Sequence, residues 1–286
     1  MRILKSKKGF DYAILFMVVV LICLGFLFWQ LNQKDKSFEK DIGDIQIGLA
    51  QTQQGADNML FYLDQSAKYS AYEAAAMLGQ QGGYINPNAA CGKVIDGSYA
   101  AWNTCQDYKN ICFPNVFNNF KQIFNDKLSK NYLESYNQAS PGADFIKDNY
   151  LFAIHNKKVT GTAIQNIEMN IAPPQSKNAQ YSAGRYAFKP SFSIDFPYDF
   201  NRYFELEKLA NSIVSNCANK FTTFADINAC AESNFAQWPD KPILKQSKTA
   251  KYITIALSKP QFISPYTGKN MTVQFALCIP HMVPTP

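Results

Sequence analysis

The chain of 286 residues contains only two histidines, and it lacks the common catalytic and nucleotide-binding motifs. There is no GxSxG elbow, no HExxH pair, no P-loop and no dinucleotide-binding fingerprint. His155 falls in an alternating stretch that predicts a half-exposed strand, and His281 lies between Pro280 and Met282 near the end of the sequence. Neither position suits a catalytic base held by an acid or a pair of metal ligands. We therefore expect no metal and no cofactor.

Charged residues are also scarce. Asp, Glu, Lys and Arg make up 17% of the sequence, and the net charge of +6 is spread along the chain beyond its basic start. No basic patch with interleaved aromatic residues occurs, so we do not expect nucleic-acid binding. Asn, Gln, Ser, Thr and Tyr are abundant instead, which is common on cell-surface proteins. With 47% hydrophobic residues the chain can still bury at least one substantial core.

Proline is absent from the first 86 residues, so nothing in this part forbids a continuous helix. Small and apolar residues recur there at spacings of three, four and seven, which predicts a helical stripe. The glycines Gly79, Gly82 and Gly83 predict its end. The stripe should pack against the protein's own head or against another copy, and we expect residues 32–83 to form a stalk. Its members are Ile42, Ile45, Leu49, Ala56, Leu60, Leu63, Ala67, Ala71, Ala74 and Leu78.

The longest hydrophobic run extends from Tyr12 to Trp29, eighteen residues without a charge or an amide. As a helix it would be about 27 Å long, close to the ~30 Å hydrocarbon core of a bilayer. Basic residues precede it and no acid occurs before Asp11, so residues 1–10 should stay in the cytoplasm as a basic leader. We predict one transmembrane helix at residues 11–31, with everything after it outside the membrane. The basic residues are Arg2, Lys5, Lys7 and Lys8.

Three interpretations of this segment stay open. A cleaved secretory signal would need an apolar region of roughly 7–15 residues and a small-x-small cleavage site, whereas this run ends in FWQLN at residues 28–32. An uncleaved signal anchor would place Trp29 at the outer interface, where indoles prefer to lie. The third interpretation rests on Lys7-Lys8-Gly9-Phe10, directly before the apolar helix. A basic stretch, a glycine and then Phe resembles the class III leader of type IV pilins and pseudopilins, over about the first thirty residues.

This resemblance implies cleavage after Gly9, so that Phe10 becomes the mature N-terminus and the apolar helix is kept. It also implies assembly through that helix, with copies of the chain or with other pilin-like subunits. In that family the fifth mature residue is usually acidic and pairs with a neighbouring subunit's amino terminus. That position is Ile14 here, and the nearest acid is Asp11 at the second mature position.

Six of the seven cysteines follow the apolar segment, while Cys23 lies inside it as a small lipid-facing or packing residue. An even number of cysteines in an oxidising compartment predicts three disulfides, with fifteen connectivities open. We favour Cys217 with Cys230, because each should lie in or beside a short helix joined by a turn. Closing that loop would contribute about 3 kcal/mol. The six candidates are Cys91, Cys105, Cys112, Cys217, Cys230 and Cys278.

Residues 84–286 should form one head of α+β architecture with a mainly antiparallel sheet. We predict helices near Asn115–Tyr136, Phe200–Asn216 and Phe224–Phe235. Tyr150–His155 and Val159–Ile171 predict a hairpin. Further strands are expected at Ser191–Phe196, Tyr252–Leu257 and Thr272–Ile279, and loops at residues 173–184 and around Pro260, Pro265 and Gly268.

Two local patterns bear on chemistry. Asp195 and Asp199 are four residues apart, and glycoside cleavage needs two neighbouring carboxylates. The other interpretation is that Asp199 caps a helix that begins at Phe200. Asn270-Met271-Thr272 is the single N-x-S/T sequon with an allowed middle residue, which makes Asn270 a candidate glycosylation site outside the membrane.

The sequence thus predicts a single-pass protein of the cell membrane: a transmembrane helix, a helical stalk and a disulfide-bonded α+β head on the outer side. We expect a pilin-like or adhesin-type structural or interaction component and not an enzyme. Its expected partners are membrane lipid and copies of itself or other pilin-like subunits, and the ligand of the head stays open. The alternative is a membrane-anchored extracytoplasmic enzyme that acts on cell-envelope polysaccharide through carboxylates such as Asp195.

Overall fold

The computed structural model describes residues 7–86, 91–139, 144–155, 157–170, 185–238, 240–259, 262–264, 268 and 270–283, of which 7–13, 35–42, 44 and 262 are described by their backbone alone. Residues 1–6 of the predicted leader, the loop at 173–184, and Pro260 and Pro265 lie outside these ranges. Two compact units divide the chain. The first comprises residues 1–58 and 168–186, and the second comprises 59–167 and 187–286.

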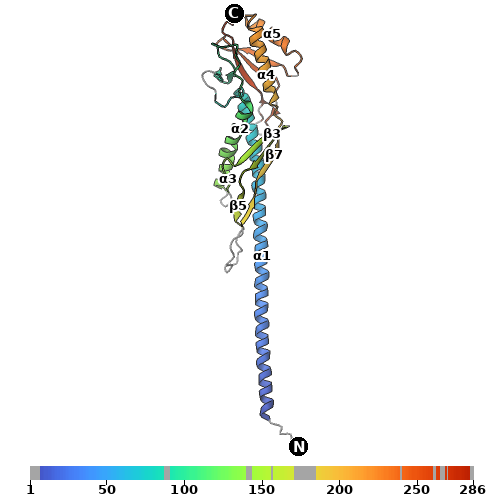
Figure 1. Cartoon of the computed structure of the whole chain (residues 1–286). Helices are drawn as coiled ribbons and strands as arrows, with labels where there is room; N and C mark the ends of the chain where they lie inside the picture. Colours follow the sequence, from blue (N-terminus) through green and yellow to red (C-terminus); the bar gives the residue numbers. More distant parts are fainter. Residues whose placement is uncertain are drawn as a thin grey trace. The chain divides into compact units, whose positions relative to one another are not determined.

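Helix α1 (Lys7–Gln80) contains 74 residues and ends at the predicted glycines (Figure 1). Its end is a Schellman cap, in which a left-handed residue closes the last turn. Gly82 takes that position with φ of +59°, and the Gly83 N–H donates to the carbonyl oxygen of Leu78 at 2.7 Å. Glycine is favoured at Gly82 because other residues pay a steric cost at positive φ. The cap therefore fixes where the chain leaves the helix.

Strands β5 (Ile167–Asn170) and β6 (Arg185–Phe188), which belong mostly to the first unit, form a two-stranded sheet. The exposed pair Glu168 and Arg185 joins them at 3.3 Å. A Cβ on Gly55 of α1 would lie 3.1 Å from the Met169 Cε, so the glycine lets β5 approach the helix.

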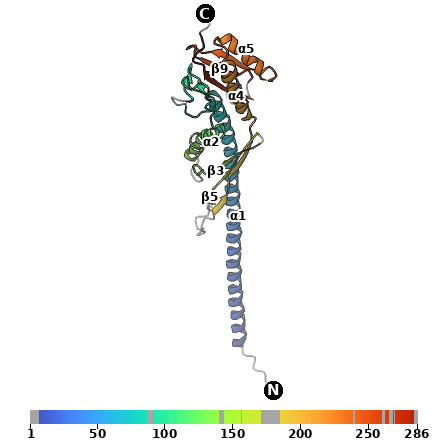
Figure 2. The ribbon, with the colours of Figure 1, turned by 45° about the horizontal axis from the view of Figure 1, so that its top comes forward.

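The predicted stripe of α1 is buried in the second unit. Tyr72 meets the ring of Phe196 edge-on at 5.7 Å, and the Tyr132 hydroxyl donates to the Glu73 carboxylate at 2.8 Å. Figures 1 and 2 both show α2 beside this part of α1. Over these turns the stripe packs on the protein's own head, whereas Ile45 and Leu49 of the first unit are 44% and 45% exposed. The fully buried members are Leu63, Ala67, Ala71, Ala74 and Leu78.

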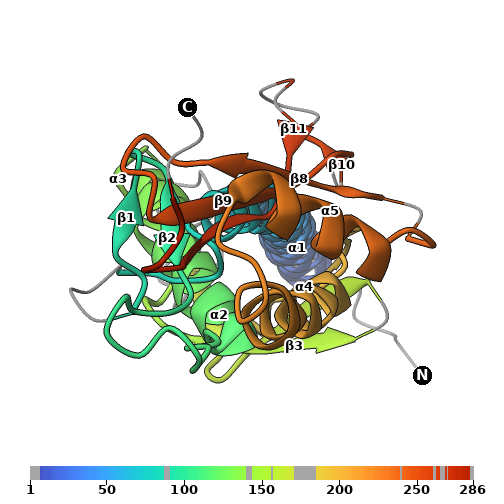
Figure 3. The same ribbon diagram turned by 90° about the horizontal axis from the view of Figure 1, so that it is seen from above.

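The main sheet has five strands in the order β1-β2-β12-β9-β8. All neighbours are antiparallel except β2 and β12, which run parallel. Figure 3 shows β8 and β9 on one side of the end of α1, with α2 and α4 on the other. The bounds are β1 (Val94–Ile95), β2 (Tyr99–Ala101), β8 (Pro242–Gln246), β9 (Tyr252–Leu257) and β12 (Gln274–Cys278).

A second, antiparallel sheet has the order β3-β4-β7. Its inner face carries Val159, Phe192 and Ile194, and a Cβ on Gly161 would collide with the Phe192 ring. A separate hairpin pairs β10 with β11. The bounds are β3 (Tyr150–His155), β4 (Lys158–Ala163), β7 (Ser191–Asp195), β10 (Phe262–Ile263) and β11 (Asn270–Met271).

The helices of the head follow their predicted positions. Asn115 and Thr223 cap α2 and α5 by accepting a backbone N–H three residues further on, which satisfies a free donor of the first turn. Two helices widen into π-helical turns. The bounds are α2 (Val116–Asp126), η1 (Lys127–Leu133), α3 (Glu134–Ala139), α4 (Asn201–Ser212), η2 (Ile213–Cys217) and α5 (Phe224–Asn234).

The described residues confirm a mixed α+β fold with mainly antiparallel sheets. The hairpin prediction needs one correction, because the predicted strand Val159–Ile171 is divided into β4 and β5. The Ile164 N–H still donates to the Asn149 carbonyl, but the Gln165 N–H donates to the Asn149 side-chain oxygen, and the pairing of β4 with β3 ends there. The sequence also missed the short strands β1, β2, β6, β8, β10 and β11.

Candidate functional site

The part of α1 from Ile14 to Lys34 is long and apolar enough to cross a membrane, by length and composition. None of it is buried within the chain. Phe16 and Phe28, for example, are 69% and 71% exposed. Water contact of such a surface costs about 25 cal/mol per Å², which favours burial of the segment in an apolar environment.

The residues that carry the pilin resemblance lie at the start of this helix. Lys7, Gly9 and Phe10 all belong to α1, whose first described residue is Lys7. Asp11 precedes Ile14 by three residues, slightly less than one helical turn. Cys23 is exposed within the apolar segment and forms no disulfide.

All six remaining cysteines are paired. Cys217 bonds to Cys230, the pair favoured from the sequence, and this bond joins η2 to α5. Cys91 bonds to Cys112, and Cys105 bonds to Cys278, 173 residues further along the chain. The last of these bonds attaches a loop to the buried strand β12.

Around Cys278 the loop is held by a second set of contacts. The Asn103 amide donates to the Cys278 carbonyl at 3.0 Å and accepts the Cys278 N–H at 2.6 Å. Trp102 stacks on Phe275 with the ring centres 3.8 Å apart, and its indole N–H donates to the Gly82 carbonyl at 2.7 Å. The end of α1, the loop and β12 therefore form one rigid part of the second unit.

Beside this part lies a groove of about 560 Å³. Three segments that are distant in the sequence form it: the end of α1, the β1–β2 hairpin and the stretch from β11 to β12. None of its lining residues is charged, and it includes the sequon residue Asn270. The lining residues are Gln80, Gln81, Val94, Gly97, Ser98, Ala100, Asn270, Thr272 and Gln274.

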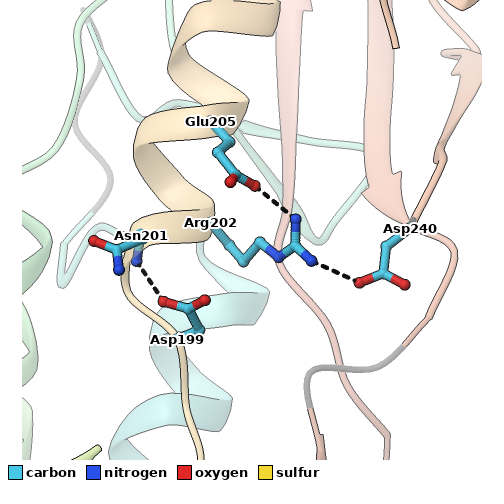
Figure 4. Close-up of polar contacts among 5 residues, drawn as sticks. All are labelled: Asp199, Asn201, Arg202, Glu205 and Asp240. Carbon is cyan, nitrogen blue, oxygen red and sulfur yellow. Dashed lines mark hydrogen bonds and ion pairs between the residues drawn. The ribbon is translucent and has the colours of Figure 1, made fainter. Parts of the chain in front are cut away.

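A cluster of charges connects α4 to the segment before β8 (Figure 4). The Arg202 guanidinium donates to Glu205 at 2.6 Å and to Asp240 at 3.0 Å. Lys259 lies 3.7 Å from the other oxygen of Asp240. The hydrogen bond to Glu205 raises the pKa of Arg202, so the cation is maintained at any physiological pH. The two terminal nitrogens of the Arg202 guanidinium are thus both bound by carboxylates of the protein itself. The arrangement acts as a clamp that joins α4 to the segment before β8.

The two carboxylates singled out for catalysis occupy different settings. Asp195 ends β7 on the solvent face, where it is 87% exposed and lies 3.6 Å from Lys158. Asp199 accepts the Asn201 N–H at 3.0 Å, just before α4. The capping prediction was displaced by one residue, since α4 begins at Asn201 and its N-cap position, Phe200, has no side-chain oxygen. Asp199 nevertheless satisfies a free N–H of the first turn.

The histidines lie apart along the chain. His155 ends β3 and is exposed, and the His281 ring meets Tyr108 edge-on at 4.9 Å. Within the described part of the chain, no three His, Cys, Asp or Glu side chains are grouped as a metal site would need.

Several tyrosine hydroxyls are buried in the head, and their burial raises the pKa of each. The hydroxyls of Tyr198 and Tyr203 lie 2.7 Å apart, and burial raises the pKa of both well above the usual value. Burial also raises the pKa of Tyr84 to about 12, and its hydroxyl donates to the Cys112 carbonyl.

Sequence reasoning missed the groove and the Arg202 clamp. No linear signal marks Gln80, Ser98 or Asp240, because each meets its neighbours only through the fold. No protein-family model, no curated protein and no solved structure matches the chain.

Proposed function

We propose that the protein is a single-pass, membrane-anchored cell-surface protein, with its N-terminus inside and its head outside. It works as a pilin-like or adhesin-type structural component that presents the head for attachment or assembly. The observation that carries this proposal is the uncovered apolar segment Ile14–Lys34. An N-terminal basic leader and a head with three disulfides support the same orientation, since disulfides persist in oxidising compartments.

In this proposal, residues 32–83 act as the stalk that separates head from membrane. Their burial pattern supports the idea, because Ile45 and Leu49 are accessible, whereas Ala56 and the stripe members from Leu63 onwards are buried. Those residues are available to neighbouring stalks, and the apolar segment is available to lipid or to like helices.

Protease protection tests the orientation. In intact cells an added protease should digest the head, while an epitope placed before Lys5 stays protected. Protection of the head, or digestion of the epitope, would contradict the proposed topology.

N-terminal sequencing from the native host tests the pilin-like part. We expect Phe10 as the first residue of the mature protein. Gly9→Val should leave a slightly larger membrane protein and abolish filaments. The matched control is Gly25→Val, because a Cβ at Gly25 would meet nothing within 4 Å and the leader is unchanged. Recovery of Met1 or Arg2 as the N-terminus, without sheared filaments, would leave a simple anchored protein.

The alternative, an anchored enzyme that cleaves envelope polysaccharide, has weaker support. Asp195 is on an exposed face beside Lys158, and Asp199 holds the start of α4, so each carboxylate has a structural role. Polysaccharide hydrolysis by the purified protein that is lost in Asp195→Asn would favour the enzyme.

A further inference from the structure

The sequon of the head begins on β11, which ends at Met271, and Thr272 follows that strand directly. Asn270 is exposed, Met271 is buried and Thr272 is partly exposed. Met271 is buried between two accessible residues, so the side chains of Asn270 and Thr272 both reach solvent. Acceptor amide and hydroxyl are therefore presented together to solvent.

Both residues also line the polar groove at the end of α1. Its other walls supply further neutral polar groups, of which Gln80 and Ser98 are exposed. Amides and hydroxyls donate and accept hydrogen bonds without charge. Such a lining matches a neutral polyhydroxylated ligand better than an ion.

The groove is firmly built. The Gln274 side chain donates to the carbonyl oxygens of Gln80 and Ser98, at 3.3 and 3.2 Å, and so ties two walls together. At Gly79 a Cβ would lie only 2.6 Å from the Thr272 carbonyl oxygen, which means that α1 is in close contact with the segment after β11. A ligand would not have to order these walls on binding, which lowers the cost of association.

The size of the groove agrees with this chemistry. At about 560 Å³ it falls within the ~300–1,000 Å³ of ordinary small-molecule sites. From these observations we propose that Asn270 carries an N-linked glycan whose first sugars lie in the groove, against Gln80 and Ser98. The inference rests on the proposed export of the head, because glycosyl transfer would take place on the outer side of the membrane.

In the transfer step the side-chain nitrogen of Asn270 forms a bond to C1 of an oligosaccharide carried on a lipid pyrophosphate. The bond from C1 to the phosphate oxygen breaks, and the lipid pyrophosphate leaves with that electron pair. One amide proton passes to a base of the transferase. No oxidation or reduction takes place.

Translation of the full chain with endoplasmic-reticulum microsomes tests whether the site is used. We expect one glycan on the wild type and on Thr272→Ser, and none on Asn270→Gln or Thr272→Ala. A matched control for export is Asn270→Gln combined with Lys158→Asn. The second change makes a sequon with Val159 and Thr160 on β4, where a buried residue again lies between two accessible ones but no residue lines the groove.

The groove itself is tested by the rate at which peptide-N-glycosidase removes the glycan from folded protein. Release at Asn270 should be about fivefold slower than release at the control site on β4, the factor expected for one net hydrogen bond. Gln80→Ala and Ser98→Ala should bring the rate towards the control value. After denaturation all rates should be equal.

The outcomes separate this inference from the proposed topology. If the control sequon is modified and Asn270 is not, the head is exported but Asn270 is no glycosylation site. If neither is modified, the proposed topology fails and the inference fails with it. If Asn270 is modified but its glycan is released at the control rate, the glycan does not lie in the groove.

Discussion

Arg202 holds two carboxylates from different elements with a side chain that is only 20% exposed. In Arg202→Met the aliphatic stem is kept, but Glu205 and Asp240 lose their shared cation. We expect the free energy of unfolding to fall by about 1–2 kcal/mol, between the values for exposed and buried pairs. The control Lys158→Met removes an exposed pair and should cost under ~0.5 kcal/mol. Urea unfolding in detergent measures both, and equal losses would show that Arg202 is no clamp.

Gly82 combines a left-handed backbone with close neighbours. A Cβ there would lie 3.0 Å from the Gln274 carbonyl oxygen and 3.1 Å from the Trp102 indole nitrogen. Gly97 has φ of +81° but open space around it, so it controls for backbone strain alone. Strain should cost ~1–2 kcal/mol in either Ala variant, and crowding should add about 1 kcal/mol at Gly82. If thermal unfolding gave the same loss of stability for Gly82→Ala and Gly97→Ala, the result would contradict the close packing at the end of α1.

The buried tyrosines make the head sensitive to alkali. The pKa of Tyr84 is raised to about 12, so the folded state keeps a proton that the unfolded chain releases near pH ~10. The contribution of Tyr84 to the free energy of unfolding is therefore fully present below pH ~10 and is lost as the pH rises towards 12. Tyr84→Phe should lower stability at pH 7 through the lost hydrogen bond but should make the decline above pH ~10 shallower. A Cys23→Ser background prevents thiol exchange during these unfolding measurements, and an unchanged slope would contradict the assignment.

Among the elements, the disulfides differ most in the loops that they close. Cys217–Cys230 spans 13 residues of separation and Cys105–Cys278 spans 173. On chain-entropy grounds the paired Ala variants should lose about 3 and about 5 kcal/mol, respectively. Urea unfolding without reductant compares them. A larger loss for the short loop would mean that strain or packing outweighs chain entropy.

Elements with a strong local pattern were predictable. The helix near Asn115–Tyr136 shows a 3.6-residue apolar period, and the hairpin strand Tyr150–His155 alternates, so both were found. β1 has two residues and β8 begins with Pro242, and neither gives a periodic signal. Their strand character comes from pairing with distant segments. The groove could not be predicted for the same reason, since Gln80 and Asn270 are 190 positions apart in the sequence.

At the scale of the whole molecule, the sequence predicted the arrangement of an apolar segment and a disulfide-bonded head better than it predicted the functional sites of the head. An uncharged run of eighteen residues leaves few structural choices, and the six cysteines after it predicted three disulfides, of which the pair Cys217–Cys230 was named correctly. Side-chain chemistry in the head depends on which loops meet, and composition carries no such information. The proposed attachment role therefore rests on architecture, and its ligand must come from experiment.

The position of β12 at the centre of its sheet has a consequence for biogenesis. The Cys105–Cys278 bond cannot form until Cys278 has been synthesised. At about 5–20 residues per second, the ribosome needs roughly 10–35 s for this separation of 173 residues. During that interval Cys91, Cys105 and Cys112 emerge as three thiols, of which only two belong together, so one is exposed to mispairing. In the topology proposed above, a disulfide isomerase on the outer side of the membrane would correct such mispairing and so limit how much of the head matures.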